Sequence, residues 1–373
     1  HLHSFPTRRS SDLTILDNIR KSNVQSCEAG GITQKVSAFT VNVKDDKKIT
    51  FIDTPGHEAF DLMRSRGGSI ADIVLLIVAA DDGVQPQTKE SIEIINRSTA
   101  KPIVVINKCD LPDVDIPKVK RELVSNGIQV EGLGGNVPVI EVSGKTGKNI
   151  SELLDLILLV AEVEGLQERE ELPKGILGKA FVLESIKDRS KGNVSTLALT
   201  QGHICEGDLF GYRMGKEYFI EKVKGVISED NSNLCLLDCG CGGKILGVSN
   251  LLELGTEVFV LENKDEKLLK SMYKEVSAES LTEDASFDDF FGDEKVSKDK
   301  LFNVIVKSSS EGSLEALKNA LNKVEEEGYS VNIVQSGVGN ITLQDVEMGS
   351  VSKAIVLGFE VGMESGVNEY AKK

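Results

Sequence analysis

An acidic residue and a proline–glycine turn end one predicted strand, where the chain reads Asp53-Thr54-Pro55-Gly56-His57. A carboxylate at the carboxyl end of a strand can reach a Mg²⁺ ion directly or through water. Gly56 lets its backbone N–H approach a phosphate where a Cβ would clash. Asp, Pro and Gly also favour ordinary turns. This segment therefore fits either an ion and phosphate site or a simple strand-to-loop turn.

A second polar segment, Asn107-Lys108-Cys109-Asp110, directly follows the apolar run Pro102–Ile106. A carboxylate in this place can accept hydrogen bonds from both N1–H and the exocyclic N2 amine of guanine, a pair of donors that adenine lacks. A site built on such bonds rejects the analogue without them by roughly 10⁴-fold. Asn107 can tether neighbouring loops and the base, while the Lys108 stem can lie over the ring. The alternative is a polar loop after a strand.

A third segment, Ser143-Gly144-Lys145, also follows a predicted strand. Its expected role is to donate a backbone N–H to the O6 atom of guanine. The fragment Gly144-Lys145-Thr146 is not a phosphate-binding loop, because that motif needs a glycine five residues before Gly144, where Val139 stands.

The order and spacing of the three segments strengthen the prediction. Asn107 lies 54 residues after Asp53, and Ser143 lies 33 residues after Asp110. Open α/β sheets bind ligands at the carboxyl ends of their strands. We therefore expect one sheet to present all three segments at one edge, with Asp110 at the purine end of a nucleotide pocket and Asp53 at its magnesium end.

The elements that must position these segments alternate between helices and strands, which is typical of a mostly parallel sheet with helices on both faces. The last helix is predicted to begin with a capping box formed by Asn149 and Glu152. Phe39, Val41 and Val43 predict a strand antiparallel to Ile49–Asp53. The other predicted elements are helices at Thr14–Ser22, Gln87–Arg97 and Ile116–Val124, and strands at Ile73–Ala80, Pro102–Asn107 and Val137–Val142.

The rest of the chain predicts a multidomain α/β protein. Short β-type runs and turns over Gly175–Leu261 indicate a small β-barrel or sandwich. Seven carboxylates and no Lys or Arg between Glu279 and Glu294 indicate a connector whose helix gives way to disorder. From Leu301 onward a βαβαβ order predicts a compact third domain. The expected boundaries are a leader 1–13, a nucleotide-binding domain 14–168, a barrel 174–262, an acidic linker 263–300 and an α/β domain 301–373.

Composition excludes several classes of protein. The 373 residues are 40% hydrophobic and 27% charged, with a net charge of −16 and six cysteines. No run of 18 apolar residues predicts a membrane span. The cysteine content is not that of a secreted disulfide scaffold, so a reducing compartment is favoured. The negative charge means that any contact with nucleic acid needs a local surface.

Two weaker motifs have simpler interpretations. Gly337-Val338-Gly339, with Glu360 21 residues further on, imitates a dinucleotide fingerprint, but Thr342 stands at the third glycine position and a tight turn is favoured. A zinc site in the barrel is less favoured than free thiols, because no Cys-x-x-Cys pair occurs among His203, Cys205, Cys235, Cys239 and Cys241.

Taken together, these segments closely resemble bacterial-type translation initiation factor two, a translational GTPase. In that family Thr33 would contact Mg²⁺ and the γ-phosphate, Asp53 and Gly56 would sense that phosphate, and His57 would position the attacking water. The resemblance covers about 360 residues and rests on Gly30–Thr33, Asp53–His57, Met63–Gly67, Ala79–Thr88, Gly192–Gly207 and Ser336–Thr342.

The resemblance implies GTP and Mg²⁺ as cofactors, hydrolysis of GTP to GDP and phosphate, and action on both ribosomal subunits. Initiator tRNA would bind through a C-terminal barrel that this sequence does not contain. We expect a monomer without membrane contact, in the bacterial cytoplasm or in a mitochondrion or plastid. Two alternatives stay open: another translational GTPase of the elongation-factor type, and a nucleotide-independent ribosome-binding scaffold with a degenerate G domain.

One part of the family pattern is not found. The family's G domain, of the P-loop NTPase type, begins with a central strand and a Gly-rich loop that ends in Gly-Lys-Thr. When Leu16–Arg20 is matched to the helix after that loop, Ser11, Asp12 and Leu13 stand where Gly-Lys-Thr is expected. We therefore expect residues 1–13 to be a non-native or disordered leader, and the G domain to lack its first strand and P-loop.

These substitutions predict weak GTP binding and negligible hydrolysis by the 373-residue chain. Hydrogen bonds to charged groups contribute about 1.5–3 kcal/mol each. Loss of the lysine and several backbone donors then costs about 5 kcal/mol, or three to four decades of affinity. Isothermal titration of the chain with GTP measures this directly, and a dissociation constant in the micromolar range or below contradicts the prediction.

Overall fold

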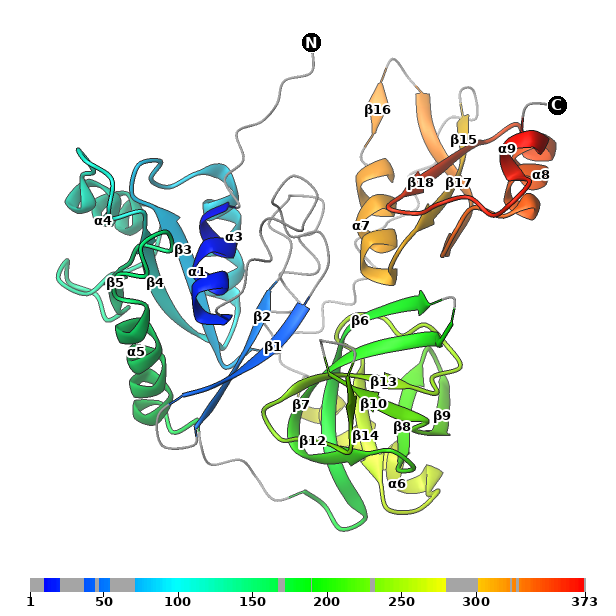
Figure 1. The fold of residues 1–373 in the computed structure, drawn as a ribbon, viewed down its shortest axis with the longest axis horizontal. Coiled ribbons are helices and arrows are strands. Elements are labelled where there is room, and N and C mark those ends of the chain that lie inside the picture. Colours follow the sequence, from blue (N-terminus) through cyan, green and yellow to red (C-terminus); the bar gives the residue numbers. More distant parts are fainter. Residues whose placement is uncertain are drawn as a thin grey trace. The chain divides into compact units, whose positions relative to one another are not determined.

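The computed structural model divides into two compact units, His1–Glu171 and Leu172–Lys373 (Figure 1). No helix in the part of the chain that it describes is long and apolar enough to cross a lipid bilayer. The described residues are 10–20, 37–43, 47–53, 71–166, 172–188, 190–228, 232–279, 301–322, 324–326 and 329–371.

The first unit is built around a parallel sheet. Among its described residues, three strands pair in the order β3-β4-β5. The middle strand is apolar throughout its centre because both of its faces are buried. Val104 and Ile106 pack into one core, and Ile103 and Val105 pack into the other. The strands are β3 (Ile73–Ala79), β4 (Lys101–Asn107) and β5 (Val139–Glu141).

Helices cover both faces of this sheet, as predicted. The first core contains Ile92 of α3 and Leu123 of α4, and the second contains Ile15 of α1 and Leu153 of α5. The parallel α/β architecture of this unit is therefore confirmed. The helices are α1 (Ser10–Arg20), α3 (Pro86–Arg97), α4 (Ile116–Ser125) and α5 (Ile150–Val163).

A hairpin packs on the same face as α1 and α5. Its strands β1 (Ser37–Asn42) and β2 (Lys48–Asp53) are antiparallel, as predicted, with the stacked rings of Phe39 and Phe51 opposite each other. The prediction of one sheet for all three polar segments is wrong for the described residues, because no described strand links β2 to β3. The hairpin joins the unit through apolar side chains in the second core.

Two predicted helix starts differ from the structure. Helix α1 begins at Ser10, four residues before the predicted start. The capping box of α5 is wrong: Asn149 has φ 58°, and its side chain makes no cap hydrogen bond. The Asn149 amide instead donates to the carbonyl oxygen of Glu141 at 2.8 Å. The hydrogen bond of Asn149 to Glu141 thus replaces the predicted cap of α5.

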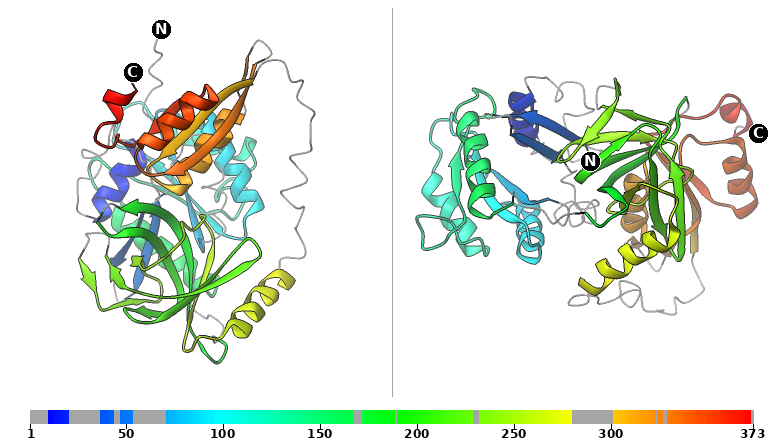
Figure 2. Two further views of the ribbon diagram at one scale, coloured as in Figure 1. Left: turned by 90° about the vertical axis from the view of Figure 1, so that its right-hand side faces the viewer. Right: turned by 90° about the horizontal axis from the view of Figure 1, so that it is seen from below.

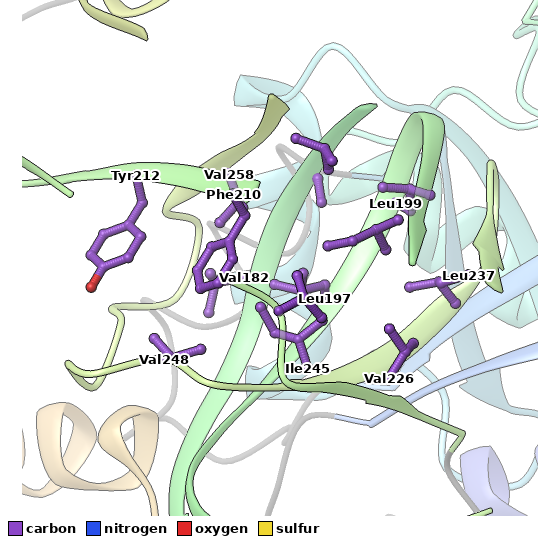
Figure 3. Close-up of a cluster of buried hydrophobic side chains, with 14 of the residues drawn as sticks. Val182, Leu197, Leu199, Phe210, Tyr212, Val226, Leu237, Ile245, Val248 and Val258 are labelled. Atoms are coloured by element: carbon purple, nitrogen blue, oxygen red, sulfur yellow. The ribbon is translucent and has the colours of Figure 1, made fainter. Parts of the chain in front are cut away.

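The second unit opens with an antiparallel sheet, in which nine described strands pair in the order β11-β10-β13-β7-β6-β14-β8-β9, with β12 also paired to β7. Strands distant in this order share one apolar core, which includes Val226 of β10 and Phe210 of β8 (Figure 3). The all-β character of this region is confirmed, while closure into a barrel stays a prediction. The strands are β6 (Ile176–Asp188), β7 (Gly192–Cys205), β8 (Leu209–Met214), β9 (Glu217–Lys222), β10 (Gly225–Ile227), β11 (Asn233–Leu234), β12 (Leu236–Asp238), β13 (Gly242–Leu246) and β14 (Glu257–Leu261).

The predicted helix of the connector packs against this sheet. Helix α6 (Glu266–Glu279) is the yellow helix beside the green strands in Figure 2. It places Leu269 and Tyr273 in a core with Phe259. The Tyr273 ring meets the Phe259 ring edge-on at 5.3 Å between centroids. The helical start of the connector is thus confirmed, and its acidic remainder, 280–300, lies outside the described residues.

The last part of the second unit has the predicted βαβαβ order. Its described strands pair as β16-β17-β15-β18, with β15 parallel to β17 and β18. Val304 and Val306 pack against Leu314 of α7 on one face. The elements are β15 (Leu301–Ser308), α7 (Glu311–Asn322), β16 (Glu325–Glu326), β17 (Tyr329–Val338), α8 (Leu343–Ser352), β18 (Ile355–Phe359) and α9 (Val367–Tyr370).

A buried ion pair fastens α8 to this sheet. Lys307 Nζ lies 3.2 Å from Asp345 Oδ2, and the two side chains are only 11% and 2% exposed. Asp345 also accepts hydrogen bonds from the N–H and hydroxyl of Thr342, both at 2.8 Å. Burial opposes ionisation of Asp345, but the bonds from Thr342 and Lys307 outweigh it and lower the pKa of this carboxyl.

Replacement of Lys307 by methionine is expected to destabilise the second unit by about 3–5 kcal/mol, because it leaves a buried carboxylate without its counter-charge. Urea unfolding at neutral pH measures the loss. The double variant Lys307→Met/Asp345→Asn removes both charges and should recover part of it. Because the folded pKa of Asp345 is lowered, its stabilising effect is present above the unfolded pKa and disappears as pH falls through the folded pKa. Equal stability of Lys307→Met and wild type contradicts this account.

Candidate functional site

A buried asparagine joins two loops at the carboxyl edge of the parallel sheet. Asn107 ends β4 and is only 1% exposed. Its Oδ1 atom accepts the Lys108 N–H at 2.7 Å and the Gly144 N–H at 2.9 Å. Its backbone carbonyl accepts the Ala80 N–H at 2.9 Å. One residue therefore fixes the loops that follow β3, β4 and β5 relative to each other.

The carboxylate of Asp110 is held in this group by a serine. The buried Ser143 hydroxyl donates to Asp110 Oδ1 at 2.7 Å and accepts the Thr146 N–H at 3.1 Å. The hydrogen bond from Ser143 is the main cause that lowers the pKa of Asp110, and the nearby charge of Lys145 acts in the same direction. Asp110 itself is exposed. The site thus offers an ionised, oriented acceptor to a ligand from solvent.

Lys108 is fixed at both ends. Its backbone has φ 64°, in the left-handed region that few residues other than glycine adopt. Its Nζ atom lies 3.0 and 2.8 Å from the two carboxylate oxygens of Asp81 and 3.7 Å from Asp82 Oδ2. The methylene stem consequently spans the edge of the sheet from the end of β4 to the end of β3.

The third loop leaves one backbone donor available. The Ser143 N–H donates to the Lys148 carbonyl at 3.1 Å, and the Gly144 N–H is taken by Asn107. The N–H of Lys145 has no hydrogen-bond partner among the described residues. Of the predicted segment Ser143–Lys145, it is therefore the Lys145 N–H that can serve as the donor to a ligand.

Helix α1 contacts the same loop, and no sequence pattern predicts this contact. The Asn18 side chain donates to the Gly144 carbonyl. A Cβ on Gly144 would lie 2.5 Å from Thr14 Oγ1 and 2.9 Å from the Ile15 nitrogen, so the close packing of α1 requires glycine here. Thr14 and Asn18 lie four residues apart on one face of α1, but no local pattern identifies their partner.

The predicted phosphate and magnesium end is only partly described. Asp53 is the last residue of β2, where it pairs in register with Ser37. Thr33, Thr54, Pro55, Gly56 and His57 lie outside the described residues. The structure therefore brings together the residues predicted to bind the base, Asn107, Lys108, Asp110, Ser143, Gly144 and Lys145. It does not show how they lie relative to a phosphate site at Asp53.

The two weaker motifs lie in the second unit. In the dinucleotide-like segment, the carboxylate of Asp345 forms a capping box with Thr342 at the start of α8. An acidic group thus stands at the helix end where a pyrophosphate would bind, which agrees with the favoured tight turn. The cysteines of the described antiparallel sheet and its loops are free, and no group of three or more His, Cys, Asp or Glu in the described residues is arranged to hold a metal ion.

Comparisons with known proteins bear on the class of the fold. Residues 8–162 match the family described as the elongation factor Tu GTP binding domain, and residues 276–373 match translation-initiation factor 2. A crystal structure of GDP-bound aIF5B from Aeropyrum pernix has a TM-score of 0.56 and 24% identity, and the alignment covers 98% of this chain and 69% of that one. The first unit has the fold of a translational GTPase G domain.

Sequence comparisons indicate which group of translational GTPases the chain resembles. The chain is 38% identical over 371 residues to translation initiation factor IF-2 of Mesoplasma florum, with 96% of this chain and 57% of the relative covered. It is 38% identical over 366 residues to that of Acetivibrio thermocellus (96% and 34%) and 36% identical over 370 residues to the chloroplastic factor of Guillardia theta (96% and 48%). The two family models and this similarity along 96% of the chain support the family of translation initiation factor IF-2. The chain spans about half the length of most of the curated relatives it matches.

Removal of the Ser143 hydroxyl should raise the pKa of Asp110, because that hydroxyl stabilises the ionised carboxylate. NMR titration of the Asp110 carboxyl carbon in Ser143→Ala measures the shift. Ser151→Ala, which removes an exposed hydroxyl on α5, is the control and should leave the titration unchanged. An unchanged pKa in Ser143→Ala shows that the hydrogen bond does not orient Asp110.

Proposed function

We propose that this chain contains the guanine-nucleotide-binding part of a translation initiation factor that acts on the ribosome. The observation that carries the proposal is the arrangement around Asn107, which holds an ionised Asp110 and the Lys145 N–H at one edge of the sheet. The Asp110 carboxylate can accept hydrogen bonds from two donors of a ligand, and the Lys145 N–H can donate to one acceptor. Guanine offers that complement at N1–H, the N2 amine and O6.

Each residue of this edge has a distinct part in the proposed recognition. Asp110 accepts from N1–H and N2 and so selects guanine, while the Lys145 N–H donates to O6. The side-chain oxygens of Asn107 and Ser143 do not contact the base in this proposal, because they already form hydrogen bonds between the loops. They set the distance between the acceptor and the donor. The Lys108 stem lies beside them as an apolar surface for the ring.

The phosphate end is assigned to the segments that the family likeness indicates. Asp53 and Thr33 would hold Mg²⁺, whose preferred ligands are carboxylate and hydroxyl oxygens. Asp53 fits this part because it stands at the carboxyl end of β2. When bound, the ion would neutralise charge on the phosphates. Thr54, Pro55 and Gly56 would bind the γ-phosphate, and His57 would position the water that attacks it.

Hydrolysis of GTP to GDP and phosphate, and action on both ribosomal subunits as they join, are the proposed activity and partner. A monomer in the bacterial cytoplasm or an organelle of bacterial descent is the proposed setting. The rival function is a ribosome-binding scaffold that needs no nucleotide. It is favoured by Ser11, Asp12 and Leu13 at the place of Gly-Lys-Thr. The match of residues 276–373 to translation-initiation factor 2, and the similarity to IF-2 along 96% of the chain, favour the initiation factor over the elongation-factor alternative.

Asp110→Asn should change the preferred base of the chain from guanine to xanthine. An amide cannot accept from N1–H and N2 as a carboxylate does, and two charge-assisted bonds at about 1.5–3 kcal/mol each make the loss at least 100-fold for GMP. The Asn amide can donate to O2 of xanthine, so binding of XMP should improve. Saturation-transfer NMR titrations with GMP, IMP and XMP measure all three affinities.

The pattern across the three nucleotides separates the two proposed functions. Wild type that prefers GMP to IMP, with the preference lost in Asp110→Asn, supports guanine recognition. Wild type that binds none of the three at millimolar concentration, and still binds ribosomes, supports the scaffold. Asp113→Asn is the matched control, since it removes a carboxylate three residues away and should leave the order of affinities unchanged.

A further inference from the structure

Two carboxylates after β3 hold the tip of the lysine that crosses the base-reading edge. Asp81 makes two contacts with Lys108 Nζ, at 3.0 and 2.8 Å, and Asp82 approaches it at 3.7 Å. The side chains of Lys108 and Asp81 are 31% and 37% exposed. The group thus lies at the surface, where a ligand can reach the lysine stem.

The backbone that carries Asp81 is itself fixed. The Ala80 N–H donates to the Asn107 carbonyl at 2.9 Å, and the Gly83 N–H donates to the Ala79 carbonyl at 3.0 Å. On the other side, the Val84 N–H donates to Glu122 Oε2 of α4 at 3.1 Å. The carboxylate of Asp81 is therefore presented from a loop anchored to both β4 and α4, rather than from a free chain segment.

The other end of the lysine is equally constrained. The backbone of Lys108 is left-handed, and its N–H is bound to Asn107 Oδ1 at 2.7 Å. Such a conformation persists in a non-glycine residue where its surroundings enforce it. Because both ends of Lys108 are fixed, its methylene groups lie along the edge of the sheet between the end of β4 and Asp81. Asp110 follows two residues later in the sequence.

We propose that Asp81 is a positioning residue of the base site, which holds the Lys108 ammonium so that the lysine stem forms an apolar wall against one face of a bound purine. The inference rests on the proposed nucleotide binding and adds a residue to it. Because methylene groups contact any purine ring alike, Asp81 sets the affinity for purine nucleotides in general. The choice of guanine is set by Asp110 and the Lys145 N–H, and Asp110 sets the preference for GMP over IMP.

A purely structural role for the Asp81–Lys108 pair makes a different prediction. Exposed ion pairs contribute little to folding stability. If that were the pair's only role, its loss would slightly lower the unfolding midpoint and leave nucleotide affinity unchanged. The proposed role predicts the same small change in the midpoint of the nucleotide-free chain, together with weaker nucleotide binding.

The test compares Asp81→Asn with wild type in NMR titrations with GMP and IMP. Affinity for both nucleotides should fall by about fivefold, the scale of one exposed ion pair, while their ratio stays the same. Glu164→Gln is the matched control. It breaks the exposed pair Lys101–Glu164, 2.9 Å long, at the opposite end of β4 and should change neither affinity.

A double-mutant cycle with Lys108→Met shows whether Asp81 acts through the lysine. In the Lys108→Met background, Asp81→Asn should have no further effect on either nucleotide. An additive effect, a changed GMP-to-IMP ratio, or unaltered affinity in Asp81→Asn overturns the inference while nucleotide binding stands. Absence of GMP binding in wild type overturns the proposed function and this inference together.

Discussion

The candidate site depends on one buried amide oxygen. Asn107 Oδ1 accepts two backbone N–H groups from loops that lie 36 residues apart in sequence, those of Lys108 and Gly144. A buried acceptor with two donors is fully used, and loss of either donor would leave polar groups unpaired in the interior. This constraint explains how the exposed groups nearby can be arranged for a ligand: the backbone that carries them is held by buried hydrogen bonds.

The sheet beneath the site supplies the rigidity that this amide needs. β4 is buried on both faces, and each face has its own core of apolar side chains. Because Asn107 is the last residue of β4, its position is set by the packing of the strand as a whole. The same strand carries the Ala80 contact that fixes the loop of Asp81. The packing of β4 therefore also sets the positions of the residues proposed to bind the base.

The second unit is stabilised by different means. Its antiparallel sheet folds around one extensive apolar core. Helix α6 contributes Tyr273 and Leu269 to a second, separate core with Phe259. The βαβαβ part has a smaller core and adds the buried pair of Lys307 and Asp345. That pair and the Thr342 cap occupy the helix end that a dinucleotide phosphate would need. The dinucleotide-like segment therefore has a structural role, which is to hold α8 against the sheet.

The sequence by itself determined the kinds and order of most elements, and it predicted a set of base-binding residues that the structure brings together at one edge of the sheet. Apolar runs such as Pro102–Ile106 are long and bounded by polar turns, so local patterning was enough to predict strands and helices. The recognition chemistry of Asp110 also follows from its residue type and its place after a strand. Such features depend on neighbours in sequence, which a single sequence shows directly.

Only the tertiary structure decided which donors and acceptors are left for a ligand. The side chain of Asn149 bonds to Glu141 instead of capping its helix, and α1 packs against Gly144 through Asn18. Lys108 meets Asp81 across 27 residues of chain, and β2 pairs with β1 outside the parallel sheet. These outcomes depend on segments distant in sequence, whose competition for the same hydrogen-bonding groups is resolved only when the chain is packed.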